Sequence, residues 1–530
     1  MKNIMKKTIT VLTLLLNTVV NYAQDPNILW QRTIGGSGED LCTDINSTID
    51  GGYIIAGMSD SDISGEKSEN SKGESDYWIV KLDINGNIDW QKTIGGEGED
   101  HLRVILQTND GGYILGGDSK SNISGDKTEN SIGLEDYWIV KITSTGLIEW
   151  QNTIGGSGHD ILYTLIATSD GGYLLGGSSN SNISGDKTED AMSEDYWIVK
   201  IDNLGNVEWD NTIGGSSPDY LKTMVETIDN GFLIGGDSWS DISGDKTEAT
   251  LGIQDYWILK LDSSGNIEWQ NTIGGNEREY LESVISLTDG GFLVTGSSDS
   301  NISGDKTENS NGEYDIWIVK VDSSGNIIWQ NTIGGSLNDG AKNITKTING
   351  GFFLSGSSES NISGDKTENS EGYTDYWVIG LNDVGIINWQ NTLGGDFIDV
   401  PSGGSLETEN SVFLIAGESS SSASGDKTED SRGGIDYWIL KVNGILNVSE
   451  NPFNTAITLY PNPVKNTLQI NTQDKTINQV NIYTITGSKV LQRDIDTVSP
   501  TVDVSCLASG VYYIQLYSGK NVALKKFVKE

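Results

Sequence analysis

The sequence predicts an all-β protein whose main part is a seven-bladed β-propeller, a closed ring of four-stranded repeats. Two tryptophan series and the apolar pattern of the strands lead to this prediction. One series stands in W-Q/D-x-T-I/L-G-G segments spaced by 59 or 60 residues, at Trp30, Trp90, Trp150, Trp209, Trp269, Trp329 and Trp389. The other stands in D-Y/I-W-I/V segments, at Trp78, Trp138, Trp197, Trp257, Trp317, Trp377 and Trp438. Repetition at a nearly fixed period indicates one supersecondary unit present several times.

Each repeat reads as four antiparallel strands. In the second repeat, glycine-containing turns and a long polar loop over 119–135 separate the expected strands, which are 101–108, 113–118, 136–142 and 148–154. In the third of these strands, Trp138 and Val140 point to one face, and Tyr137 and Ile139 point to the other. A sheet that is apolar on both faces must lie between neighbours, and sheets stacked around an axis provide them.

The two ends of the repeat region favour a closed ring. The region opens with a lone fourth strand at 29–34, and the seventh repeat ends after its third strand at 436–442. If these two strands pair, every sheet has four strands and no long edge is left free to aggregate. The hairpin over 140–150 also resembles the tryptophan-docking hairpin of quinoprotein-type propellers, in which the indole packs between blades. This resemblance covers about a quarter of each repeat and implies the propeller fold, while no quinoprotein cofactor ligands can be located.

The first 24 residues read as a signal peptide. Lys2, Lys6 and Lys7 form its basic start, 9–20 its apolar stretch, and Ala23 precedes the expected cleavage before Gln24. No later segment reaches the length of apolar sequence that a membrane span needs. Cys42 and Cys506 lie in different expected domains, so a disulfide framework is not expected to stabilise the exported protein.

After a repeat region at 25–445 and a linker at 446–456, residues 457–530 carry a different pattern. Three motifs stand in order: one over 459–463, one over 482–487 and one over 507–514. Their characteristic residues are Tyr460, Pro461, Asn462, Pro463, Gly487, Gly510 and Tyr512. This segment resembles the type A sorting domain of the type IX secretion system of Bacteroidetes. The resemblance implies export across the outer membrane by that machinery, with the cargo then released or attached to the surface.

The same segment also has a plain physical interpretation. Alternating apolar and polar residues over 467–471, 479–485 and 510–517 predict a small antiparallel, Ig-like β-sandwich. A purely structural Ig-like module is the alternative to a sorting domain.

The charge of the chain restricts its partners. The formal net charge is −41, and since residues 1–24 and 446–530 are both slightly basic, residues 25–445 carry −46. Such a charge repels nucleic acid and anionic surfaces, so cations or basic partners fit the repeat region better.

Calcium is one candidate ligand. Loops rich in Ser, Asn and Asp oxygens contain one aspartate in each of six repeats, at Asp126, Asp186, Asp245, Asp305, Asp365 and Asp426. In the alternative interpretation, Ser-Gly-Asp-Lys-Thr-Glu is a turn whose side chains bond local amides. No loop has the spacing of an EF-hand, and the lysine after each aspartate is unfavourable for a metal.

One tryptophan lies outside both series. The fourteen repeated indoles are expected in the core, but Trp239 stands in the long loop of the fourth repeat, where the other copies have Asp60, Lys120, Asn180, Asp299, Glu359 and Ser420. We therefore expect Trp239 to be exposed, as a ligand contact or folded onto its own loop.

The sequence favours a binding or structural protein of the cell surface or medium, with a glycan, a protein or calcium as possible ligand. An extracellular hydrolase or lyase acting on polysaccharide is the alternative. No single-copy set of acid, base and nucleophile stands out. His101 and His159, expected in loops of neighbouring repeats, are too few for a histidine-based zinc centre.

Overall fold

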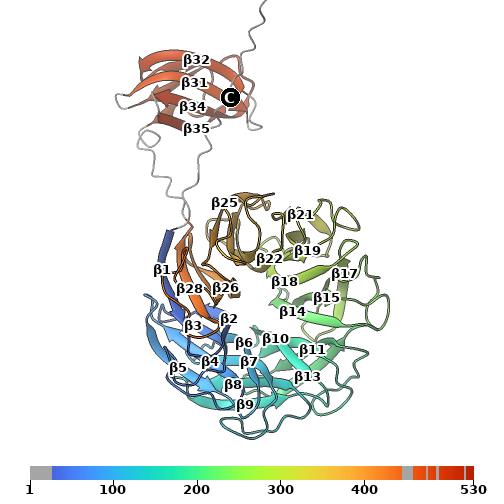
Figure 1. The fold of residues 1–530 in the computed structure, drawn as a ribbon. Coiled ribbons are helices and arrows are strands. Elements are labelled where there is room, and N and C mark those ends of the chain that lie inside the picture. The colour runs from blue at the N-terminus through green and yellow to red at the C-terminus, as the bar shows by residue number, and fades with distance from the viewer. Residues whose placement is uncertain (1–26, 445–456, 473–474, 485–488, 519–520) are drawn as a thin grey trace, which may run out of the picture. The chain divides into compact units, whose positions relative to one another are not determined.

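Antiparallel sheets of four strands recur along most of the chain (Figure 1). The computed structural model describes residues 27–444, 457–472, 475–484, 489–518 and 521–530, and these contain strands but no helix. The predicted signal peptide with Ala23, the predicted linker and Gly487 lie outside the described residues. Two compact units are distinguished, Asp25–Gly444 and one that includes Ile445–Glu530, and each is described by itself.

Seven four-stranded sheets make up the first unit within its described residues. In chain order, the first sheet has β2 (Asp40–Ser47), β3 (Tyr53–Ser59), β4 (Asp76–Leu82) and β5 (Ile88–Ile94), and the second has β6 (Asp100–Gln107), β7 (Tyr113–Ser119), β8 (Asp136–Ile142) and β9 (Ile148–Ile154). The third has β10 (Asp160–Ala167), β11 (Tyr173–Ser179), β12 (Asp195–Ile201) and β13 (Val207–Ile213), and the fourth has β14 (Asp219–Glu226), β15 (Phe232–Ser238), β16 (Asp255–Leu261) and β17 (Ile267–Ile273).

The fifth sheet has β18 (Glu279–Ser286), β19 (Phe292–Ser298), β20 (Asp315–Val321) and β21 (Ile327–Ile333). The sixth has β22 (Asp339–Lys346), β23 (Phe352–Ser358), β24 (Asp375–Leu381) and β25 (Ile387–Leu393). The seventh has β26 (Asp399–Glu409), β27 (Val412–Ser419), β28 (Asp436–Asn443) and, from the start of the chain, β1 (Asn27–Ile34). Figure 1 shows the first strand of each sheet at the inside of the ring and the fourth at the outside.

Apolar side chains on both faces of each sheet explain why the sheets stack. The indoles of the D-Y/I-W-I/V series are fully buried, and one hydrophobic cluster fills each interface between neighbouring sheets. A second contact uses the tyrosine before the indole. In the second sheet, the Tyr137 hydroxyl donates to the Trp197 carbonyl of the third sheet at 3.0 Å, and their ring centroids lie 4.8 Å apart. Ile316 of the fifth sheet has no hydroxyl and makes only the apolar contact.

The tryptophans of the other series dock between sheets, as their hairpins suggested. Trp150 packs against Gly205, a turn residue of the next sheet with a φ of 87°. A Cβ atom on Gly205 would lie 2.7 Å from the indole, so only glycine permits both this backbone conformation and this approach. The Trp150 side chain is half-buried, while Trp197 of the buried series is wholly enclosed.

The N-terminal strand completes the seventh sheet. β1 pairs antiparallel with β28 from Asn27↔Asn443 to Ile34↔Tyr437, so the edge left by the missing fourth strand is filled. Interface contacts continue across this point, because the Tyr437 hydroxyl donates to the Trp78 carbonyl at 3.3 Å. The seventh and first sheets are therefore joined by hydrogen bonds and by the same packing of aromatic side chains as the other neighbouring sheets.

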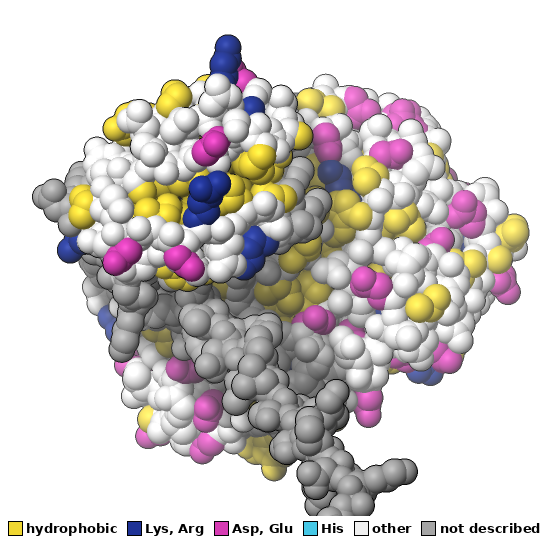
Figure 2. Space-filling model, turned by 90° about the horizontal axis from the view of Figure 1, so that it is seen from above, with side chains coloured by type: hydrophobic (Ala, Val, Ile, Leu, Met, Phe, Trp, Pro, Cys, Tyr) yellow, Lys and Arg dark blue, Asp and Glu magenta, His cyan; other side chains and the backbone are white. Residues whose placement is uncertain are grey.

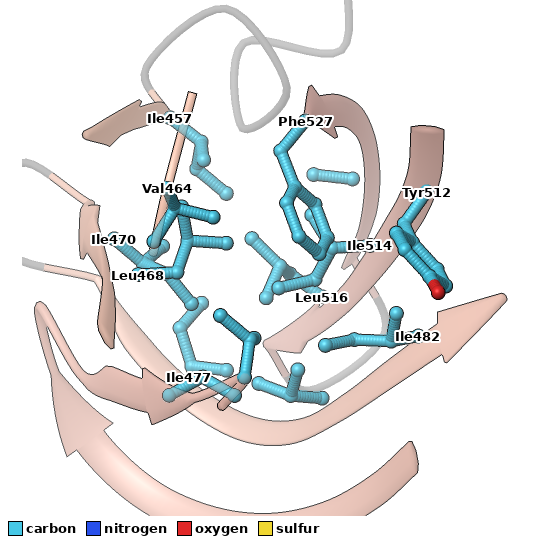
Figure 3. Close-up of a cluster of buried hydrophobic side chains, with 14 residues drawn as sticks. Ile457, Val464, Leu468, Ile470, Ile477, Ile482, Tyr512, Ile514, Leu516 and Phe527 are labelled. Atoms are coloured by element: carbon cyan, nitrogen blue, oxygen red, sulfur yellow. The ribbon is translucent and has the colours of Figure 1, made fainter. Parts of the chain in front are cut away.

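The second unit has two sheets in its described residues. One contains β29 (Thr458–Tyr460), β30 (Thr467–Asn471) and β33 (Thr501–Asp503), and the other contains β31 (Thr476–Thr484), β32 (Lys489–Val498), β34 (Gly510–Ser518) and β35 (Asn521–Lys529). Figure 3 shows side chains from both sheets meeting in one apolar core, including Leu468, Ile482, Ile514 and Phe527.

Ring closure makes a prediction about Gln31. Its side-chain oxygen accepts from the Trp438 indole and the Thr428 amide, both at 3.1 Å, and its side-chain nitrogen donates to the Asp426 carbonyl at 2.7 Å. Gln151 makes the equivalent three bonds inside a covalently continuous sheet. We expect Gln31→Ala and Gln151→Ala to lower the free energy of unfolding equally, by about 2 kcal/mol or more, because each leaves the same buried groups unpaired.

Thermal and urea unfolding of the two variants would measure this. A large loss of stability for Gln151→Ala with none for Gln31→Ala would mean that β1 does not close the ring in solution.

Candidate functional site

The six aspartates proposed from the sequence to bind calcium lie in the loops between the second and third strands of six sheets. The Asp186 carboxylate accepts the amide hydrogen of Gly155 at 3.2 Å, and the Asp186 amide donates to the Gly155 carbonyl at 2.9 Å. Gly155 follows β9, so the contact links the second sheet to the third. The same pairs recur as Asp126 with Gly95, Asp245 with Gly214, Asp305 with Gly274, Asp365 with Gly334, and Asp426 with Gly394.

The other charged side chains of this repeated loop also pack within the fold. Lys187 is buried, which lowers the pKa of its ammonium to about 8, and its Nζ lies 5.2 Å from the Trp197 ring centroid. The Glu189 carboxylate accepts the amide hydrogen of Thr212 at 2.9 Å. In the described structure, the charged side chains of the Asp-Lys-Thr-Glu segment thus hold the loop to its own sheet and to the neighbouring sheet.

These aspartates are distributed over six sheets and are not brought together. Figure 2 likewise shows acidic side chains spread singly over the visible face. Among the described residues, the one group of His, Cys, Asp and Glu side chains close enough to surround an ion is His101, Asp118 and Glu135, and none of the six belongs to it. Calcium binding by these aspartates stays a prediction.

His101 lies in strand β6, in agreement with the expected strand over 101–108 and not in a loop as the argument about zinc had it, because its backbone pairs with Asp118 of β7. Its Nδ1 lies 3.1 Å from Asp118 Oδ2, and Arg103 Nε donates to Asp118 Oδ1 at 3.0 Å. Burial opposes ionisation of Asp118, but Arg103 and His101 together hold the pKa of its carboxyl below the ordinary value.

Glu135 stands on the other side of this group. It is 7 % exposed, and burial together with the neighbouring Asp118 charge raises the pKa of its carboxyl. Lys120 Nζ lies 3.8 Å and His159 Nδ1 3.4 Å from its oxygens. Since cations and imidazoles already surround both carboxylates, the arrangement is a balanced charge network whose cations oppose a metal ion.

The repeats differ from one another at one end of the inner strands, as they also do in the segments before the third strands, such as 132–135 and 251–254. The second residue of each first strand pairs with the penultimate residue of the second strand, as in the pair Tyr220↔Asp237. The corresponding pairs are Leu41↔Met58, His101↔Asp118, Ile161↔Ser178, Tyr280↔Ser297, Gly340↔Ser357 and Val400↔Glu418. The fourth residues differ as well, being Thr43, Arg103, Tyr163, Lys222, Glu282, Lys342 and Ser402. This end of the ring is where the symmetry of the repeats is broken.

A pocket of about 370 Å³ lies at this end, where β10, β14 and β18 run side by side. It is referred to below as the inner-strand pocket, and it is lined by Tyr163, Glu194, Tyr220, Lys222, Asp237, Trp239, Tyr280 and Glu282. A pocket of this size with aromatic walls and a few charged groups is typical of small-ligand sites. Another cavity, of about 400 Å³, lies among the hairpin turns of the fourth and fifth sheets and includes Thr227 and Lys260. Most repeats have the same residue types at those two positions.

Trp239 belongs to the inner-strand pocket. The residue was expected to be exposed and is half-buried, because its ring packs edge-on against Tyr220, with centroids 5.4 Å apart and planes at 84°. Its amide donates to the Pro218 carbonyl at 3.0 Å, which fixes the backbone. A role for Trp239 in ligand contact stays a prediction, and its placement is compatible with that role.

Two charged side chains shape the electrostatics of the pocket. The Lys222 ammonium lies 4.3 Å from the Tyr163 ring centroid and 5.7 Å from that of Tyr220. Asp237 is 2 % exposed, and burial raises the pKa of its carboxyl to about 7, although the Lys222 charge and the Leu281 amide at 2.7 Å lower it in part. The Glu282 charge acts in the same direction as burial. Asp237 therefore changes its protonation near neutral pH.

The opposite sector of the ring has its own buried carboxyls. Burial raises the pKa of Asp44 and of Glu418 to about 7, and the Lys342 charge lowers both in part. Aromatic side chains do not accompany these groups at the corresponding positions, which are Leu41, Thr43, Gly340, Val400 and Ser402. The aromatic pocket is thus confined to one side.

Apart from Trp239, the residues of the inner-strand pocket were missed by reasoning from the sequence. The signal was present, since copies that agree at Trp, Asp and Gly positions disagree at the second and fourth residues of their first strands. Its meaning depended on knowing that these strands are innermost (Figure 1) and that residues from three sheets line one pocket.

The residues of the predicted sorting motif lie in the second unit. Tyr460 ends β29 and is exposed, while the Asn462 carboxamide accepts the Val528 amide hydrogen at 2.8 Å and so ties this motif to the last strand. Pro461 and Pro463 flank Asn462, and Gly510 begins β34. Tyr512 is buried in the core, with its hydroxyl donating to the Ala508 carbonyl at 3.0 Å.

Residues 458–530 match the secretion system C-terminal sorting domain. The resemblance found in the sequence is confirmed for this segment, which places the protein at the cell surface or outside the cell and implies interaction with the secretion machinery. The comparison with curated proteins found no match. Within the described residues, no helix could cross a membrane.

Solved structures similar to the chain include propeller-like folds. The extracellular domain of BT4673 from B. thetaiotaomicron, titled as part of a hybrid two component system, has a TM-score of 0.40 and 10% identity, covering 93% of this chain and 56% of its own. The chain thus spans 56% of that relative's length. The Pan2 WD40 domain of Neurospora crassa has a TM-score of 0.38 and 11% identity, covering 76% of this chain and 89% of its own.

Asp237 makes the stability of the protein depend on pH. Its carboxyl binds a proton with a pKa of about 7 in the folded state and close to 3.8 when unfolded, so the free energy of unfolding falls as the pH rises from about 4 to 7. Asn at this position keeps the oxygen that accepts from Leu281 and never becomes charged. We expect Asp237→Asn to gain stability relative to the wild type between pH 5 and pH 8, by up to about 4 kcal/mol.

Melting temperatures across this pH range would test the expectation. Asp241→Asn, on the exposed loop of the same sheet, controls for the loss of one acidic residue. A stability difference between Asp237→Asn and wild type that does not vary with pH would contradict the assigned protonation.

Proposed function

We propose that this chain is a seven-bladed β-propeller, exported by the type IX secretion system, that binds a ligand at the cell surface or in the medium. The ligand is bound at the inner-strand end of the ring, where the seven repeats differ. Residues 1–24 form a signal peptide cleaved after Ala23, 25–445 the propeller and 446–456 a linker. Residues 457–530 form an Ig-like sorting domain that the secretion machinery recognises.

The single observation that supports this function is where the symmetry is lost. In the repeated loops, Asp186 is occupied by a contact with the neighbouring sheet, and Lys187 is occupied by a contact within its own sheet. At the inner-strand end, Tyr163, Lys222 and Tyr280 stand at positions that hold other residue types in most repeats, and they share one pocket. A ring that only needed stability would have no reason to differ there, whereas a binding site needs particular side chains in one place.

An extracellular hydrolase or lyase acting on polysaccharide is the second candidate. It is favoured by one observation, the buried Asp237 with a pKa of about 7 in the same pocket as Glu282. Two carboxyls held in different environments can divide the roles of acid and base. Turnover of a polysaccharide that is lost in Asp237→Asn, with binding retained, would favour this candidate over simple binding.

Export depends on the C-terminal segment in this proposal. In a host with a type IX system, we expect the complete chain in the medium or on the surface, and a chain lacking 458–530 in the periplasm. Cell fractionation and immunoblotting would measure the distribution, with Trp239→Ala as an exported control. Equal export of the truncated chain would refute this route.

Binding at the inner-strand end is tested separately. The immobilised complete chain should retain material from the polysaccharide or the protein fraction of culture medium. A Tyr163→Ala/Tyr280→Ala double variant should lose this retention. Glu359→Ala is a matched control, because Glu359 occupies the loop position of Trp239 in the sixth sheet, outside the pocket. Equal retention by the double variant would exclude the inner-strand pocket as the binding site.

A further inference from the structure

The inner-strand pocket gathers four aromatic side chains in one sector of the ring. Tyr163, Tyr220, Trp239 and Tyr280 come from three neighbouring sheets, and each is half-buried, so each keeps part of its ring accessible. Trp239 is held edge-on by Tyr220, and Tyr280 packs edge-on against Tyr314 with centroids 5.7 Å apart. The rings are therefore fixed before a ligand arrives, which reduces the entropy lost on binding.

Polar groups of both kinds stand between the rings. Glu194 accepts a hydrogen bond from the Tyr220 hydroxyl at 2.8 Å and, as a carboxylate, has further acceptor capacity. Glu282 lies on the other side and is within 3.4 Å of Lys342 Nζ. Lys222 is a donor held in place by the faces of Tyr163 and Tyr220. A ligand here meets fixed donors and acceptors beside apolar faces.

This combination excludes several ligand classes. A purely apolar ligand would leave Glu194, Lys222 and Glu282 without the water that now solvates them, at a large cost. A cationic ligand would compete with Lys222, whose ammonium already occupies the ring faces. A polyanion such as nucleic acid is repelled by the net charge of −46 on residues 25–445.

A neutral sugar is neither purely apolar nor cationic nor polyanionic, so none of these three objections applies to it. The C–H face of a pyranose packs on an aromatic ring, and its hydroxyls both donate to carboxylates and accept from an ammonium. We propose that the inner-strand pocket binds a saccharide, with a sugar ring stacked on Trp239 or Tyr280 and hydroxyls bonded to Glu194, Lys222 and Glu282. This inference rests on the proposed binding function and names its ligand class.

The experiment uses the complete secreted chain and defined probes. The probes are cello-, xylo-, manno-, laminari- and chito-oligosaccharides, each titrated to millimolar concentration in a calorimeter and followed by tryptophan fluorescence. We expect one series to bind and to change the fluorescence. Trp239→Ala should weaken binding about tenfold or more, and Lys222→Met should weaken it as well, because both remove direct contacts.

Controls separate loss of contact from loss of fold. Glu359→Ala, at the loop position of Trp239 in the sixth sheet, should bind like the wild type, and all variants should keep the melting temperature within a few degrees. If Trp239→Ala unfolds, Trp239→Phe replaces it and should bind with intermediate affinity.

The outcomes distinguish this inference from the proposed function. Absence of binding across the panel, or binding that Trp239→Ala and Tyr280→Ala leave unchanged, would overturn the saccharide site. A tryptic digest of surface proteins serves as the second probe. Binding of a peptide from it that requires Trp239 would overturn the saccharide and leave the binding function intact. No binding of either probe would overturn both.

Discussion

The structure of the ring depends on one constraint, which is that no sheet can exist without a neighbour on each face. Trp197 and Tyr137 belong to adjacent sheets, and both are fully buried because their rings pack against each other in the interface between those sheets. A linear array would expose such a surface at both ends. The pairing of β1 with β28 completes the seventh sheet, which then packs against the first sheet, so neither end of the array is exposed. Stability is therefore cooperative around the ring.

This constraint also decides which residues are available for function. Repeated positions maintain the framework. The loop aspartates of six sheets, such as Asp186, bind the neighbouring sheet, and the loop lysine and glutamate bind within their own sheet. Gly205 cannot change without a clash with the Trp150 indole. The contacts of the second and fourth residues of the inner strands differ from repeat to repeat, as with the bond from Thr43 to the Leu102 carbonyl. Variation there costs the ring little, and this is where His101, Lys222 and Tyr280 occur.

The same reasoning explains what could be predicted from the sequence. Periodicity and two-faced apolar strands indicated four-stranded repeats, and the offset between strands 29–34 and 436–442 indicated how the ends pair. The role of Asp186 was ambiguous, because oxygen-rich loops suit both a cation and a self-bonded turn. Only the structure shows that the Asp186 carboxylate accepts the amide hydrogen of Gly155. The pocket around Trp239 was hidden because its walls come from strands about sixty residues apart, whose contact is a property of the closed ring.

The residue types at the inner-strand end do not vary without effect on stability, because one of them is a buried acid. Burying Asp237 raises the pKa of its carboxyl to about 7, which means that the ionised form opposes folding at neutral pH. Ser178 and Ser297 occupy the same position in the adjacent sheets and bring no such cost. A fold under pressure for stability alone would use serine in the fourth sheet too. Burial also raises the pKa of Glu418, at the same position in the seventh sheet, to about 7, so this cost alone does not mark a binding site. What distinguishes Asp237 is that it stands beside Lys222 and Glu282 in the aromatic pocket.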